Sequence, residues 1–226
     1  MARRLFSASI VCVLASGALG AAGFWETKPF REWSDKEARK MFEDSPWAAL
    51  IAVPLPNRGP LPTPDSTGGR GGGGRGAGGG AEGFGPAPVR VRLTISWRSA
   101  LPLKEATARQ QAGEGGTIPP DTEAALAREE ELYVVAIQGL PQQYTQSGPT
   151  RTVDAFLHRN GKPDIPAARG ASQPAQGGAI LFIGFPRTDP ITLADGDVEF
   201  AVKIGALSVT KKFKLKDMVF HGRLEL

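Results

Sequence analysis

The amino-acid sequence predicts an α+β fold, mainly an antiparallel, sandwich-like sheet with two or three short helices. Between residues 89 and 226, several short segments alternate apolar and polar side chains, as strands with one buried face do. Glycine, proline and asparagine residues between these segments supply turns. The helix signals lie nearer the front of the chain, which favours an α+β arrangement over an all-β one.

Shifts in composition divide the chain into four zones. Residues 1–22 are predicted to be a signal peptide, and residues 23–56 to form a helix and a strand packed on the main body. Residues 57–88 are predicted to be a disordered linker or loop, rich in glycine, proline and arginine. Residues 89–226 are expected to form the main β-rich domain.

The first zone has the charge pattern of a secretory signal. Arg3 and Arg4 precede an uncharged apolar stretch, Leu5–Gly20, and small residues follow as far as Ala22. The alternatives are an uncleaved anchor helix, for which the stretch is short against the ~20 residues that span a bilayer, or a twin-arginine signal. We expect cleavage, no transmembrane segment in the mature chain, and a periplasmic or extracellular location.

Removal of this segment would also remove Cys12, the single cysteine of the chain. The mature protein would then have no disulfide, no thiolate nucleophile and no cysteine metal site. The chain has no Asn-x-Ser/Thr sequon either, which favours a bacterial source. Two of the four net positive charges are Arg3 and Arg4, so nothing in the mature chain's charge calls for a nucleic-acid partner.

The second zone opens with a helix signal. Ser34 and Glu37 have capping-box spacing, and Pro46 stops the helix, so we expect it over about Asp35–Asp44. The apolar run Trp47–Val53 is then expected to add a strand to the main body.

Five aromatic residues crowd this zone: Trp25, Phe30, Trp33, Phe42 and Trp47. We expect them to pack the short helix onto the sheet, because a ten-residue helix is marginal alone. The alternative is a docking surface for a partner.

The glycine tract 68–80 carries only two arginines, Arg70 and Arg75. Arg-Gly segments that bind nucleic acid repeat this unit many times and interleave aromatics, so a linker is the favoured interpretation.

The first half of the main body shows strands alternating with helices. Val89–Trp97 alternates strictly and is the clearest strand. Pro102 starts a helix to about Gln111, and Asp121 is expected to cap another to about Glu130. Leu132–Gln138 is the next predicted strand.

The remaining residues are the densest in strand signal. A short strand is expected at 155–157, followed by an Asn160–Gly161 turn and a loop over 165–176. Further strands are predicted over 179–185, 198–204 and 209–215, and over Met218–Leu226 at the end of the sequence.

A search for chemistry in the sequence nominates no catalytic, cofactor-binding or metal-binding residue. His158 and His221 have no second histidine or carboxylate at ligand spacing, and surface roles are expected for both. Asp195, Asp197 and Glu199 share a strand face and would suit calcium, but an Asp-Gly turn followed by a polar strand face is the favoured interpretation.

Three groups of motifs are KPF, WSDKE and DSPWA within 28–48, FPR and PITL within 185–193, and KFKLKDM with GRLEL within 212–226. Together they resemble those of an uncharacterised group of exported bacterial proteins. The group has no assigned activity, so the resemblance implies a secreted bacterial origin and transfers no site residues.

The leading functional hypothesis is a non-enzymatic binding or assembly module of the cell envelope, acting on an unidentified envelope protein. The alternatives are a hydrolase that uses a pair of carboxylates and a purely structural envelope protein. Facing carboxylates in a pocket would favour the hydrolase, whereas residues 24–54 undocked from the body would favour the structural role.

Overall fold

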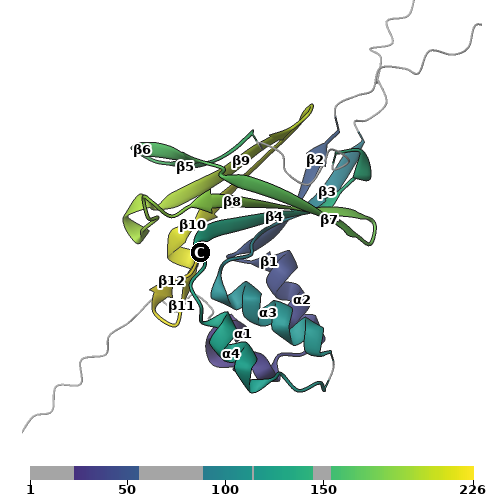
Figure 1. The fold of residues 1–226 in the computed structure, drawn as a ribbon, viewed down its shortest axis with the longest axis vertical. Helices are drawn as coiled ribbons and strands as arrows, with labels where there is room; N and C mark the ends of the chain where they lie inside the picture. Colours follow the sequence, from purple (N-terminus) through teal and green to yellow (C-terminus); the bar gives the residue numbers. More distant parts are fainter. Residues whose placement is uncertain (1–22, 56–88, 114, 145–153) are drawn as a thin grey trace, which may run out of the picture.

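The computed structural model describes residues 23–55, 89–113, 115–144 and 154–226 (Figure 1). The predicted signal peptide and the predicted linker over 57–88 lie outside the described residues. Two antiparallel sheets and a group of helices make up the described fold, so the predicted α+β class with a mainly antiparallel sheet is confirmed. No helix among the described residues is long and apolar enough to cross a membrane.

The larger sheet has six strands in the order β1-β2-β3-β4-β8-β7, all antiparallel. Sequence neighbours pair along most of it, as short turns between strands favour. The strands are β1 (Asp44–Ser45), β2 (Ala48–Pro54), β3 (Arg90–Trp97), β4 (Leu132–Leu140), β7 (Arg169–Ala175) and β8 (Gly178–Pro186).

The smaller sheet has four strands in the order β10-β9-β5-β6, and a two-stranded hairpin, β11-β12, follows it in sequence. The predicted Asn160–Gly161 turn joins β5 to β6, with Gly161 at φ 70°. The strands are β5 (Asp154–Arg159), β6 (Lys162–Pro166), β9 (Asp197–Ile204), β10 (Leu207–Lys214), β11 (Val219–Phe220) and β12 (Arg223–Leu224).

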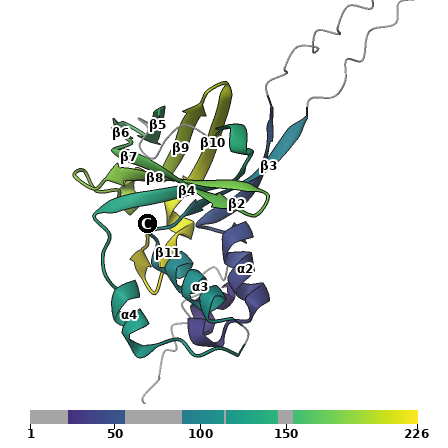
Figure 2. The ribbon, with the colours of Figure 1, turned by 45° about the vertical axis from the view of Figure 1, so that its right-hand side comes forward.

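The helices gather on the side of the larger sheet that faces away from the smaller one (Figures 1 and 2). The four α-helices are α1 (Phe24–Thr27), α2 (Asp35–Glu43), α3 (Leu101–Ala112) and α4 (Pro120–Leu126). Short 3-10 helices cover Phe30–Glu32, Gln142–Tyr144, Leu193–Asp195 and Leu215–Asp217.

One hydrophobic core joins the two sheets. Trp97 of β3 is fully buried and meets Phe213 of β10 edge to face, with ring centroids 5.4 Å apart. Phe185 of β8 and Phe200 of β9 make a second such contact at 6.1 Å. Because these pairs bridge the sheets, the inner faces pack as in a sandwich.

The N-terminal segment is part of the same core. Ser34 and Glu37 form the predicted capping box, and Ala38, Met41 and Phe42 make up the buried face of α2. β2 then pairs with β3, with Ala48 opposite Ser96.

Its aromatic residues are packed rather than displayed, as expected. Trp33, Phe42 and Trp47 are buried, and Trp25 and Phe30 are half-buried against the core.

Three local predictions were wrong. Residues 165–176 are not a loop, because they end β6 and form β7. β7 buries little besides Gly170 and is held by pairing with β8, so it carries no apolar alternation of its own. The second helix, α4, starts at Pro120 and ends at Leu126, and Asp121 lies in its first turn rather than at its cap.

The predicted terminal strand over 218–226 was the third error. A tight turn divides it into the β11-β12 hairpin, because His221 and Gly222 both have positive φ, at 48° and 78°. Hydropathy alone does not reveal such a reversal.

Candidate functional site

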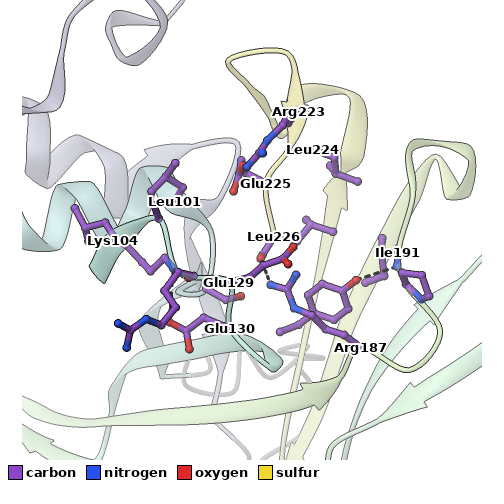
Figure 3. A pocket seen from close by; sticks show the side chains of 16 residues that line it. Leu101, Lys104, Glu129, Glu130, Arg187, Ile191, Arg223, Leu224, Glu225 and Leu226 are labelled. Atoms are coloured by element: carbon purple, nitrogen blue, oxygen red, sulfur yellow. Dashed lines mark hydrogen bonds and ion pairs between the residues drawn. The ribbon is translucent and has the colours of Figure 1, made fainter. Parts of the chain in front are cut away.

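A groove of about 650 Å³ lies where α3, the end of α4, the loop after β8 and the terminal hairpin meet (Figure 3). Its floor and walls include the apolar side chains of Leu101, Leu126, Ile191 and Leu224, with the ring of Tyr133. The volume is in the range of about 300–1,000 Å³ that is typical of ligand sites. The groove therefore offers apolar side chains beside polar and charged ones, a mixed surface that side chains of a partner can enter.

Arg187 is the organising cation of the groove. Its guanidinium lies 4.2 Å from the centre of the Tyr133 ring, and its NH2 group donates a 2.6 Å hydrogen bond to the main-chain oxygen of Leu226. Figure 3 shows this side chain reaching toward Leu226 across the groove. The stacking and the hydrogen bond fix the guanidinium before any ligand arrives.

Tyr133 is fixed from its other end. Its hydroxyl oxygen accepts a 2.9 Å hydrogen bond from the main-chain N–H of Ile191, and both residues are buried. The ring of Tyr133 also contacts Trp97 edge to face at 5.9 Å, which anchors this wall to the sandwich core. The groove is thus built on rigid elements rather than on an isolated loop.

The rim carries charges of both signs, several of them already paired. Lys104 lies 3.6 Å from a Glu130 carboxylate oxygen and donates to the main-chain oxygen of Arg128 at 2.9 Å. Arg223 and Glu225 form a 3.1 Å ion pair on the opposite wall. A rim of mixed sign suits a polypeptide better than a nucleic acid, whose phosphates favour cations alone.

No known protein family, curated protein or solved structure matches this chain. The assignment of this site therefore depends on its geometry.

A smaller pocket of about 340 Å³ lies between α1, α3 and the hairpin turn. Glu105 lines it with Glu123, Trp25 and His221. Burial raises the pKa of the Glu105 carboxyl to about 7, and the negative charges of Glu225 and Glu123 add to the rise. Glu123 is already paired with Arg31 at 2.7 Å.

Both histidines lie at the surface, as expected. His158 Nδ1 lies 2.8 Å from a carboxylate oxygen of Asp164, and its ring stacks on Phe156. The β5-β6 hairpin brings this carboxylate close, which spacing in sequence did not indicate. His221 stacks on Phe220 at 3.9 Å and lines the smaller pocket.

The acidic trio forms the turn expected from its Asp-Gly pair. Asp195 ends a 3-10 helix in a capping box with Thr192, Gly196 has φ 70°, and β9 begins at Asp197. The Asp195 carboxylate lies 2.6 Å from Lys162 Nζ. Although burial opposes ionisation of Asp195, the hydrogen bonds from Lys162 and the Thr192 N–H lower its pKa.

In the part of the chain that the structure describes, no three carboxylates or histidines converge on a possible metal position.

Sequence reasoning missed the groove itself. Its walls come from residues near 101–104, 126–133, 187–191 and 223–226, which are far apart in the sequence. The last two stretches overlap the FPR, PITL and GRLEL motifs, but these motifs have no assigned activity, so no local signal marks the four stretches as one site.

Proposed function

We propose that this chain is a non-enzymatic binding or assembly module of a bacterial cell envelope. Its groove would hold a segment of a partner protein. The observation that carries the proposal is a groove lined by both apolar side chains and paired opposite charges, organised in advance by Arg187 on Tyr133. Preorganised aromatic and arginine anchors are what protein interfaces use for affinity.

The location in the envelope is part of the proposal and is supported by the charge and hydropathy pattern of residues 1–22. We expect expression in a Gram-negative host to place the protein in the periplasmic fraction, shortened after Gly20 or Ala22. Intact mass and cell fractionation would measure this. A full-length product in the cytoplasm would contradict the location and leave the groove proposal to its own test.

Capture from an envelope extract tests the binding role. The native protein is compared with Arg128→Glu, which reverses an exposed rim charge, and with Leu224→Arg, which fills the groove floor. Leu193→Arg is the matched control, because Leu193 is 53% exposed and lies outside the groove. We expect a defined partner that both groove variants lose and the control keeps. Equal capture by all four proteins would overturn the proposal.

One observation favours the hydrolase alternative. Burial, together with the negative charges of Glu225 and Glu123, raises the pKa of Glu105 to about 7, as in sites where one carboxyl acts as an acid. Turnover of chromogenic glycosides by the native protein, abolished in Glu105→Gln, would support this alternative. If the native protein turns over none of the chromogenic glycosides, the hydrolase alternative is excluded for this class of substrate.

The structural alternative receives less support. It expected residues 24–54 to stand apart from the body, whereas Trp33, Met41 and Trp47 lie in the common core.

A further inference from the structure

The smaller pocket between α1, α3 and the hairpin turn has an aromatic wall. Trp25, Phe30, Phe220 and His221 all line it. Trp25 and Phe220 both pack edge to face on the buried ring of Trp47, with ring centroids 6.1 and 6.2 Å apart. These contacts hold the wall in place before any ligand arrives. The volume of about 340 Å³ suits a small chemical group rather than a folded segment.

Glu105 of α3 brings a carboxyl without a partner into this pocket. In the part of the chain that the structure describes, it accepts no hydrogen bond and forms no ion pair. The two basic side chains of the pocket are already engaged: Lys28 lies 2.8 Å from a carboxylate oxygen of Glu37, and Arg31 lies 2.7 Å from one of Glu123. The pocket therefore has a carboxyl that lacks a counter-charge.

The charges around Glu105 favour a positively charged ligand. Burial raises the pKa of its carboxyl to about 7, and the negative charges of Glu225 and Glu123 add to the rise. A bound cation would offset this repulsion, whereas a neutral ligand such as a sugar would leave it in place. The charged and titratable groups that surround Glu105 are Glu26, Lys28 and Arg31 of the N-terminal segment, Glu123 of α4, and His221 and Glu225 of the terminal hairpin.

The lining of the pocket suits an organic cation better than a metal ion. A hard metal ion takes several oxygen ligands, and no three carboxylates or histidines converge on one position among the described residues. Aromatic rings attract an ammonium group and cover the alkyl stem that carries it. The oxygens of Glu105 call for N–H donors, which a protonated alkylamine has and a quaternary ammonium lacks.

We propose that this pocket binds a protonated alkylamine, whose ammonium group donates to the Glu105 carboxylate while its alkyl stem lies along Trp25 and Phe220. A free amine and the lysine side chain of a protein share this chemistry. The pocket has no lining residue in common with the groove, so this proposal and the proposed function can fail independently.

Titration of the full mature protein with n-butylammonium chloride, followed by NMR at pH of about 8, tests the proposal. We expect saturable shifts at the Trp25 indole N–H and at the main-chain amides of Glu105 and His221. Glu105→Gln keeps the size of the side chain and should weaken binding by about tenfold or more, because it removes the charged acceptor. Glu43→Gln is the matched control, because Glu43 is exposed at the end of α2, and it should bind the probe as the native protein does.

Three further probes separate the chemical features of the ligand. 1-Pentanol lacks the charge and tetramethylammonium lacks N–H donors, so both should bind at least about tenfold more weakly than butylammonium. Nα-acetyl-lysine methylamide presents the same ammonium group on a piece of main chain. Tighter binding of this probe than of butylammonium would identify a lysine side chain as the ligand, and weaker binding would identify a free amine.

The pH dependence of binding is a second readout. Binding of butylammonium should weaken as pH falls from about 8 to about 5.5, because Glu105 then takes up a proton and loses its charge. His221→Asn removes the histidine of the pocket, and asparagine tolerates the positive φ of 48° at this position. We expect this variant to keep the pH dependence and Glu105→Gln to lose it.

Equal binding of butylammonium by the native protein and Glu105→Gln would overturn the proposal, as would the absence of a saturable shift at the pocket resonances. Tetramethylammonium that binds as tightly as butylammonium would also overturn it, because N–H donation to Glu105 would then have no part in recognition. Amine binding that persists when the groove captures no partner would contradict the proposed function alone.

Discussion

The indole N–H of Trp47 donates a 2.8 Å hydrogen bond to the main-chain oxygen of Glu225. This bond ties the segment before β2 to the terminal hairpin, which forms one wall of the groove. Trp47 is fully buried and also contacts Phe220 of β11 edge to face, with ring centroids 6.2 Å apart. The N-terminal segment therefore supports the site although it contributes no lining residue.

The first prediction concerns this contact. Trp47→Phe removes the indole donor and leaves a cavity, so we expect the free energy of unfolding to fall by about 2–3 kcal/mol. Urea denaturation measures the loss. Trp25→Phe is the control, because Trp25 is half-buried and its indole donates no hydrogen bond to a described residue. The free energy of unfolding should fall clearly less in this variant than in Trp47→Phe. Equal losses would contradict the role given to Trp47.

The second prediction concerns a buried cation that is held by carbonyls. Arg109 is 6% exposed and donates to the main-chain oxygens of Trp33, Gly113 and Gly116 at 2.8, 2.8 and 3.0 Å. Arg109→Met leaves these three acceptors without that donor, so we expect a loss of about 3–5 kcal/mol in chemical denaturation. Arg39→Met, at an exposed position of α2, should change stability by no more than about 0.5 kcal/mol. A similarly small change in stability in Arg109→Met and Arg39→Met would contradict the stabilising role of the Arg109 hydrogen bonds.

The third prediction is a pH dependence from Glu105. Its pKa is about 7 in the folded protein against a reference value of 4.5, so the unfolded chain loses this proton at lower pH than the folded one. The folded state binds more protons in that window, and stability falls as pH rises from 4.5 to 7 and then levels off. We expect this carboxyl to account for about 2–3 kcal/mol of the fall.

Glu105→Gln removes the titrating group and should flatten this part of the stability profile, with a gain in stability above pH 7. Urea melts at a series of pH values measure it, and Glu129→Gln, an exposed rim residue, is the control. If stability falls with pH as steeply in Glu105→Gln as in the native protein, the Glu105 carboxyl does not cause the fall.

Much of the fold was readable from local sequence because its signals are local. The capping box of Ser34 and Glu37, the strand β3 and the Asn160–Gly161 turn depend on neighbours within a few residues, and the structure confirms them. The alternation of β3 does not persist in its burial, because Ser96 on the polar face is also buried. β7 and the terminal hairpin were misjudged because β7 owes its conformation to β8, and the hairpin to a positive φ at His221.

The candidate site was not readable for a related reason. Arg187 acquires its role only when the fold sets it against Tyr133 and Leu226. Glu105 acquires its raised pKa only when the fold buries it, and the nearby charge of Glu225 adds to the rise. Arg187 belongs to the FPR motif, but that motif has no assigned chemistry, and Glu105 lies in none of the quoted motifs, so the chemistry of both residues appears only after tertiary packing.

The fourth prediction compares two glycines in left-handed backbone. Gly139 has φ 90°, and an added Cβ would lie 2.7 Å from the main-chain oxygen of Arg92, whereas Gly161 has φ 70° and open space. Gly161→Ala should cost about 1 kcal/mol from the backbone conformation alone. Gly139→Ala adds the clash and should cost at least about twice as much, measured by thermal and urea melts. The reverse order would contradict the close approach of Gly139 to Arg92, at the point where the register between β4 and β8 shifts from Gln138 to Leu140.

The central claim is that the groove beneath Arg187 receives a partner protein, and site-specific photocrosslinking in living cells tests it most directly. A photoreactive amino acid is placed at Leu101 or Leu224 in the groove and, as a control, at Arg39 on the exposed face of α2. We predict one discrete adduct from both groove positions, absent from Arg39 and lost when Arg128→Glu is added. Groove positions that give no adduct, or the same adducts as Arg39, would contradict the claim.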